Sequence, residues 1–125
     1  MRSITKIFTF EACHHLPNYE GSCHELHGHS YKLEVTVGGR IITDTNNHKC
    51  GMIIDFKDLK KIVNEVAVDK YDHSYLNDFF ENPTAEIMVE KISKDILGRL
   101  STIPNCYLVS CRLWETSTSY AEYIL

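Results

Sequence analysis

The sequence predicts an α+β fold in which two helices cover one face of a four-stranded antiparallel sheet. Two segments of alternating polar and apolar residues come first, two segments with helically spaced apolar residues follow, and two more alternating segments end the chain. This ββααββ order groups the helices at mid-chain, as expected for helices packed on one face of an antiparallel sheet. With 125 residues, 43% of them hydrophobic, residues 1–125 are expected to form one domain.

The first two predicted strands are residues 3–13 and 28–43. Both alternate polar and apolar residues, and both contain many of the aromatic and β-branched residues that strands favour. The adjacent Gly38 and Gly39 predict a bulge near the end of the second strand.

Two helices are predicted next. Asp55 is a good N-cap for the first, and Asn82-Pro83-Thr84 opens the second. The apolar stripe of the first helix is Leu59, Ile62, Val63, Val66 and Ala67, and that of the second is Met88, Val89, Ile92, Ile96, Leu97 and Leu100. Each helix therefore has one apolar side, which we expect to pack on the sheet.

Residues 106–115 and 118–125 are the last two predicted strands. Alternation places Tyr107, Val109, Cys111 and Leu113 on one face of the first of them. Cysteines within such apolar strands are expected to be buried, inert thiols; these are Cys13, Cys106 and Cys111.

Composition argues against several classes of function. The formal net charge is −4 and there is no basic cluster, so we expect no nucleic-acid partner. No apolar run is long enough to span a membrane, and residues 1–6 lack the apolar core of a signal peptide. Five cysteines, an odd number without paired spacing, indicate reduced thiols and a cytoplasmic protein.

The most informative residues are histidines. His27 and His29 stand two apart at the start of a predicted strand, so their imidazoles share a face. A third imidazole from the neighbouring strand would complete the three-histidine ligand set of a catalytic zinc ion with one open position. His14 and His15 point to opposite faces, so only one of them can join the set. The alternative is a pair of surface histidines on a strand.

Three further features are candidates for chemistry, each with a simpler alternative. Cys23 is either a loop thiol or, near bound metal, a thiolate suited to act as a base or nucleophile. Asp72 and His73 are either a solvated pair at a helix end or an acid–base pair. Glu115, at the end of an apolar strand, lies either at a rim or inside a pocket where it accepts hydrogen bonds from a ligand.

Together these residues resemble one family. The motifs that carry the resemblance, in chain order, are Phe10-Glu11-Ala12-Cys13-His14, Cys23-His24-Glu25-Leu26-His27-Gly28-His29, Asp55-Phe56, Asp72-His73-Ser74-Tyr75-Leu76-Asn77, Asn82-Pro83-Thr84-Ala85-Glu86 and Glu115-Thr116. Over essentially its full length the chain resembles the 6-pyruvoyl tetrahydropterin synthase family. It looks most like the bacterial branch that forms 6-carboxytetrahydropterin for queuosine biosynthesis, because Cys23 stands four residues before His27.

The resemblance implies a role for each matching residue. It places zinc on His14, His27 and His29, and so selects His14 over His15. It makes Cys23 the catalytic base and Asp72 and His73 the catalytic pair. It makes Glu115 the anchor of the pterin ring, and places Thr84 and Glu86 on the segment that closes the pterin pocket, usually from an adjacent subunit.

The resemblance also implies a fold and a reaction. The fold is the tunnelling fold (T-fold), in which the sheets of three subunits join into a barrel and two trimers stack, giving a homohexamer. The implied reaction converts 7,8-dihydroneopterin triphosphate to 6-carboxy-5,6,7,8-tetrahydropterin, acetaldehyde and triphosphate. One alternative is the 6-pyruvoyl product, formed without side-chain cleavage. Another is a non-catalytic module in which zinc only stabilises an assembly, although closed structural zinc usually takes four protein ligands.

Overall fold

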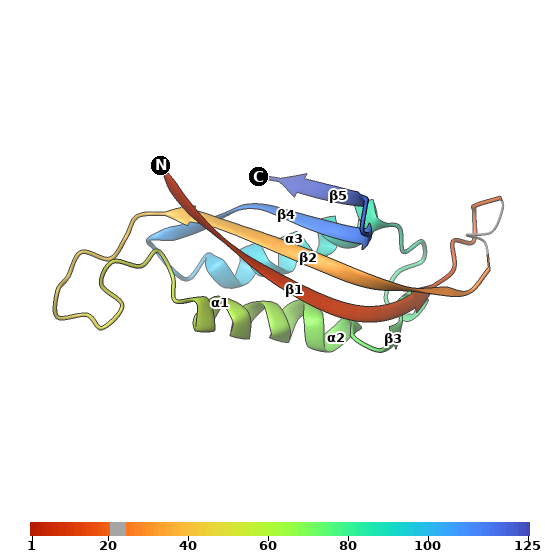
Figure 1. The fold of residues 1–125 in the computed structure, drawn as a ribbon, viewed down its shortest axis with the longest axis horizontal. Helices are drawn as coiled ribbons and strands as arrows, with labels where there is room; N and C mark the ends of the chain where they lie inside the picture. The colour runs from red at the N-terminus through yellow and green to blue at the C-terminus, as the bar shows by residue number, and fades with distance from the viewer. Residues whose placement is uncertain (21–24) are drawn as a thin grey trace.

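A mixed five-stranded sheet forms the centre of the structure, a computed structural model that describes residues 1–20 and 25–125. The strands are β1 (Arg2–His14), β2 (His27–Gly39), β3 (Ser74–Tyr75), β4 (Cys106–Thr116) and β5 (Ser119–Ile124). Their order in the sheet is β3-β1-β2-β4-β5, and only the β1–β3 pair is parallel (Figure 1). The prediction of a four-stranded, wholly antiparallel sheet is therefore wrong in one respect, because it lacks the parallel strand β3. With two residues, β3 is too short to show an alternating pattern.

The helices lie where the sequence predicts them. The first helical stretch consists of α1 (Phe56–Val63), the π-helical turn η2 (Asn64–Val68) and α2 (Asp69–Tyr71). After the short 3-10 helix η3 (Leu76–Asp78), the second is α3 (Ala85–Leu100). Asp55 caps α1 by accepting a hydrogen bond from the Lys57 N–H, which confirms its predicted role. Both α1 and α3 lie on one side of the sheet (Figure 1), with α3 packed mainly against β4 and β5.

Strand β2 ends at Gly39 and not at the predicted Thr43. Gly39 has φ +150°, and a Cβ placed there would lie 2.2 Å from the backbone oxygen of Asn105, so only glycine fits. Beyond it the chain leaves the sheet, since the Arg40 N–H donates to the Asn105 carbonyl and Ile42 pairs with Met52.

The bulge lies on β4 and not at Gly38-Gly39. Thr36 pairs with Ser110 and Val37 with Leu108, so Val109 is the extra residue. As a result Cys106 and Leu108 are buried together with Cys111 and Leu113, whereas Tyr107 is exposed. The predicted face of Tyr107, Val109, Cys111 and Leu113 is therefore wrong for its first two members.

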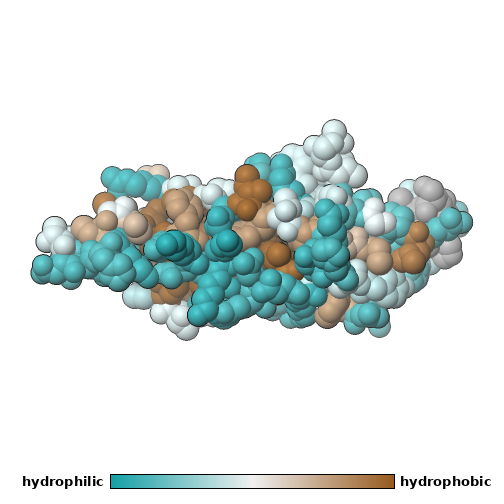
Figure 2. Space-filling view, turned by 60° about the horizontal axis from the view of Figure 1, so that its bottom comes forward, coloured by the Kyte–Doolittle hydropathy of each residue, from teal (hydrophilic) through white to brown (hydrophobic). Residues whose placement is uncertain are grey.

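The core fills the space between the sheet and the helices. Its largest fully buried side chains are Tyr31, Tyr71, Phe10, Leu33, Leu59, Leu76, Met88, Ile92, Ile96, Leu100 and Leu113, together with the polar His14. The surface brought forward in Figure 2 is mostly hydrophilic, with apolar side chains showing in patches. In the described residues, no helix has the length and apolar character needed to cross a membrane.

Candidate metal centre and pterin pocket

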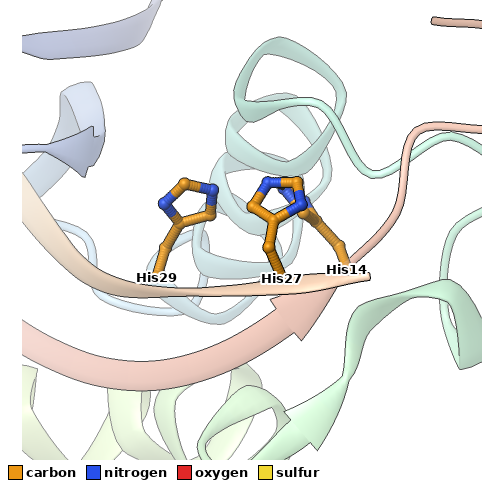
Figure 3. Close-up of side chains that lie close together, drawn as sticks. All are labelled: His14, His27 and His29. Carbon is orange, nitrogen blue, oxygen red and sulfur yellow. Dashed lines mark hydrogen bonds between the residues drawn. The ribbon is translucent and has the colours of Figure 1, made fainter. Parts of the chain in front are cut away.

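Three imidazoles converge at one end of the sheet (Figure 3). His14 is the last residue of β1 and pairs directly with His27, the first residue of β2, while His29 lies two residues further along β2 on the same face. The ring centroids are 4.6 Å apart for His14 and His27, 4.7 Å for His27 and His29, and 5.0 Å for His14 and His29. One potential ligand atom from each ring lies within 4.8 Å of the others.

Backbone carbonyls fix the protonation of two of these rings. Nδ1 of His14 lies 3.0 Å from the Pro83 carbonyl oxygen, and Nδ1 of His27 lies 2.7 Å from that of Glu25. A carbonyl can only accept, so each Nδ1 carries a proton, and in the neutral ring the Nε2 then presents the lone pair. This is the arrangement by which outer-shell carbonyls orient histidine ligands.

The distance between those two Nε2 atoms fits a shared cation. The Nε2 atoms of His14 and His27 are 3.1 Å apart. Two nitrogens bound to one tetrahedral zinc ion at about 2.0–2.1 Å would be separated by about 3.3 Å. Nε2 of His29 is also buried and has no hydrogen-bond partner in residues 1–20 and 25–125. The three rings together could therefore bind a metal ion.

Burial favours the neutral forms of His14 and His29, and the neutral imidazole is the form that binds metal. Desolvation lowers the pKa of both His14 and His29 below the usual value of 6.5. For His29 the nearby Glu115 carboxylate opposes this effect, since its Oε1 lies 3.5 Å from the His29 Nε2. The Tyr31 hydroxyl lies 3.2 Å from the His14 Nδ1, and burial raises the pKa of Tyr31, so this hydroxyl stays protonated.

Glu115 contacts His29 and also lines a separate hollow. Ala85, Glu86, Glu115, Ser119, Tyr120 and Ala121 line that hollow. It therefore brings two of the predicted substrate ligands, Glu86 and Glu115, into one place beside His29. Thr84 is the N-cap of α3, where its hydroxyl accepts a hydrogen bond from the Ile87 N–H at 3.2 Å.

The Asp72–His73 pair lies apart from this hollow. The Asp72 carboxylate accepts the Glu11 N–H at 2.9 Å, and its Oδ1 lies 3.1 Å from Nδ1 of His73. The pair adjoins a shallow hollow lined by residues 11–13, 28–30 and 73–75. The His73 side chain is 80% exposed, whereas His14 is fully buried. Both His29 and His73 line that shallow hollow, but in residues 1–20 and 25–125 no hydrogen bond or ion pair joins Asp72 or His73 to the three clustered histidines.

The remaining predicted site residue, Cys23, lies outside the described residues. Of the thiols predicted to be inert, Cys106 and Cys111 are buried, and burial raises the pKa of Cys111 to about 11. Cys13 is only half-buried, with its thiol 3.6 Å from the Ser74 carbonyl oxygen.

Two contributors to the centre were not predicted. The Pro83 carbonyl holds His14, yet a backbone carbonyl leaves no signature in a sequence. Tyr31 could have been found, because it follows His29 by two residues on the same strand face.

Fold and site together define an α+β protein with a candidate three-histidine metal centre. The model of the family described as 6-pyruvoyl tetrahydropterin synthase matches residues 3–124. The chain belongs to that family.

Curated relatives share much of the sequence. The chain is 35% identical over 141 residues to the 6-carboxy-5,6,7,8-tetrahydropterin synthase of Haemophilus influenzae, covering 98% of this chain and 99% of that protein. It is 38% identical over 122 residues to the Synechocystis protein of the same name, covering 96% and 91%.

The fold also matches a solved structure. The 6-pyruvoyl tetrahydropterin synthase of Caenorhabditis elegans superposes with a TM-score of 0.81 at 23% identity, covering 99% of this chain and 95% of that one. This likeness confirms the predicted T-fold.

Proposed function

We propose that the protein is a zinc-dependent 6-carboxy-5,6,7,8-tetrahydropterin synthase. The observation that carries the proposal is the pair of Nε2 atoms of His14 and His27, 3.1 Å apart and beside His29 and Glu115. Relatives of that name cover almost the whole chain, which supports the same reaction here. The proposed substrate is 7,8-dihydroneopterin triphosphate, and the products are 6-carboxy-5,6,7,8-tetrahydropterin, acetaldehyde and triphosphate, with one water consumed.

In this proposal Glu115 anchors the pterin ring. Its carboxylate reaches the hollow beside the metal centre and can accept two hydrogen bonds from the 2-amino and N3–H edge of the ring. Glu86 lines the same hollow, and Thr84 caps α3 immediately before Ala85, which also lines it. Zinc held by His14, His27 and His29 would act as a Lewis acid that lowers the pKa of the side-chain hydroxyls of the substrate.

Cys23 and the Asp72–His73 pair are the proposed proton-transfer groups. Cys23 removes a proton from the side chain of the substrate, and His73 relays protons while Asp72 orients its ring. Because His73 is exposed and His14 is buried, we propose that His73 reaches the metal centre of a second copy of the chain. An oligomer, by family resemblance a dimer of trimers, would then be required for activity.

The test is direct incubation of the purified, zinc-loaded protein with 7,8-dihydroneopterin triphosphate. Mass analysis should detect 6-carboxy-5,6,7,8-tetrahydropterin, and a coupled alcohol dehydrogenase assay should detect acetaldehyde. A 6-pyruvoyl product without acetaldehyde would assign the other branch of the family. Absence of turnover with full zinc content would favour a zinc-stabilised assembly module instead.

A further inference from the structure

The side chain of Asn77 holds the backbone immediately after the metal-ligand candidate His14. Its Nδ2 donates to the His15 carbonyl at 2.9 Å, and its Oδ1 accepts the His15 N–H at 3.0 Å. That N–H belongs to the peptide unit that joins His14 to His15. The amide of Asn77 therefore fixes the plane through which the backbone leaves His14.

Asn77 continues a series of contacts between β1 and the segment 72–77. The Asp72 carboxylate binds the Glu11 N–H, the His73 N–H donates to the Glu11 carbonyl at 2.5 Å, and β3 pairs with Ala12 and Cys13. The backbone then turns into the 3-10 helix η3, so it no longer pairs with β1. At this point the side-chain amide of Asn77 replaces the strand backbone as hydrogen-bond partner. It supplies His15 with both a donor and an acceptor, as the peptide of a neighbouring strand would.

Besides Asn77, His14 is held by its pairing with His27, by the full burial of its side chain and by the contact of its Nδ1 with the Tyr31 hydroxyl. It is the last residue of β1, and its ring is held by the Pro83 carbonyl. Small rotations of the His14 backbone would move its Nε2 relative to that of His27, and tetrahedral ligation tolerates such displacement poorly.

We propose that Asn77 is a positioning residue for the metal centre. By fixing the peptide unit between His14 and His15, Asn77 sets the direction of the His14 side chain. Its hydrogen bonds also connect the metal site to the segment that carries Asp72 and His73. This inference rests on the proposed metal site, and it assigns to Asn77 a role in metal affinity beyond its contribution to folding. Removal of an outer-shell partner typically weakens metal binding about 10–100-fold.

Asn105 offers a matched control. It is half-buried like Asn77, and its Nδ2 donates to two backbone carbonyls, of Arg40 and Ile53, both at 2.8 Å. It lies beside Gly39, at the end of β2 opposite to His27, about 40 Å away along the strand at about 3.3 Å per residue. Asn105→Ala thus removes a comparable amide without touching the metal centre.

The experiment measures zinc dissociation constants of the full-length protein by competition with a chromophoric chelator, and the visible spectrum with Co²⁺ in place of zinc. Asn77→Ala should bind zinc about 10-fold more weakly and change the Co²⁺ spectrum. Asn105→Ala should match the wild type in both, although metal-free thermal unfolding should show both variants destabilised. If Asn77→Ala does not fold, Asn77→Asp, which keeps the acceptor but not the donor, should change both readouts in the same direction.

The outcomes separate the two proposals. A wild type that binds no zinc would overturn the proposed metal site itself. A wild type that binds zinc, together with an Asn77 variant of equal affinity and unchanged Co²⁺ spectrum, would overturn the positioning role alone. If zinc binding were weakened equally in the Asn77 and Asn105 variants, the effect would be one of general stability, and the positioning role would again be overturned.

Discussion

Asp72 and His73 are neighbours in the chain, yet Oδ1 of the first lies 3.1 Å from Nδ1 of the second. Adjacent side chains in regular structure point apart, and the contact forms because His73 has φ +59°, in the left-handed region. The Glu11 N–H holds the Asp72 carboxylate from the other side. The strain of a left-handed histidine is retained at the site of a proposed proton relay, which is where such strain commonly occurs.

The first prediction concerns acid stability. The hydrogen bond from the Glu11 N–H, with a smaller effect of His73, lowers the pKa of Asp72. The stabilisation is therefore present above the unfolded pKa of about 3.9 and is lost as the pH falls through the lower folded value. Asp72→Asn should remove this dependence, so that urea unfolding measured from pH 5 to pH 2 falls less steeply than in the wild type. Parallel curves for the two proteins would contradict the assignment.

The second prediction distinguishes the adjacent histidines His14 and His15. His14→Ala should lose zinc and activity, with a larger loss of affinity than the about 10–100-fold typical of an outer-shell partner. His15→Ala should keep zinc, because the His15 ring bonds to the Tyr75 hydroxyl at 2.7 Å and lies outside the cluster. Atomic absorption on both purified variants decides the matter, and an empty site in the His15 variant would refute the ligand set.

The third prediction tests whether two copies share a site. His14→Ala and His73→Ala should each be inactive alone. Equal amounts of the two variants are then unfolded and refolded together. If each site takes His14 from one copy and His73 from another, random assembly should give about a quarter of the sites both wild-type histidines. Recovery of activity in the mixture is the readout. A mixture as inactive as its components would mean that each chain supplies both residues to its own site.

The fourth prediction concerns the pterin anchor. Glu115→Gln keeps the shape of the side chain but loses its charge and one strong acceptor. Leaving a buried donor unpaired costs about 1–3 kcal/mol, so pterin binding should weaken roughly 10-fold to 100-fold. Calorimetric titration with a pterin product measures the change, and Glu122→Gln, a change on β5 where the carboxylate binds Arg112, is the control. Unchanged affinity would place Glu115 at the rim of the pocket.

The fifth prediction separates proton transfer from metal binding. Cys23→Ala should abolish turnover while zinc content, oligomer size and pterin binding stay near those of the wild type. The reason is that the proposed thiolate acts on a substrate proton and not on the metal. Loss of zinc in this variant would instead make Cys23 a fourth ligand, as in a structural site.

Local patterns were enough to predict most of the fold. The alternation in β1 and β2, the Asp55 cap and the apolar stripes of both helices needed no long-range information. The bulge at Val109 could not be predicted, because it appears only in the pairing of β4 with β2, where a Cβ on Gly38 would lie 3.0 Å from side-chain atoms of Tyr107 and Val109. Strand β3 was missed for the same reason, since two residues become a strand only through their contact with β1.

The site, too, could be predicted only in part from the sequence. The spacing of His27 and His29 predicted a shared face, but the choice of His14 over His15 rested on family resemblance. The structure places His14 in the cluster because β1 ends in register with β2, at the His14–His27 pair. Support from a carbonyl, such as that of Pro83, depends on tertiary structure and not on side-chain type.

The π-helical turn Asn64–Val68 interrupts the helix that leads to Tyr71 and Asp72. Such a turn holds one residue more than α-helical bonding would, as if a single residue had been inserted. The turn therefore absorbs one residue of length and keeps Tyr71 in the core and Asp72 within reach of the Glu11 N–H. Without such a turn the added residue would rotate everything beyond it by about 100° about the helix axis, so that Tyr71 would leave the core and Asp72 would lose Glu11.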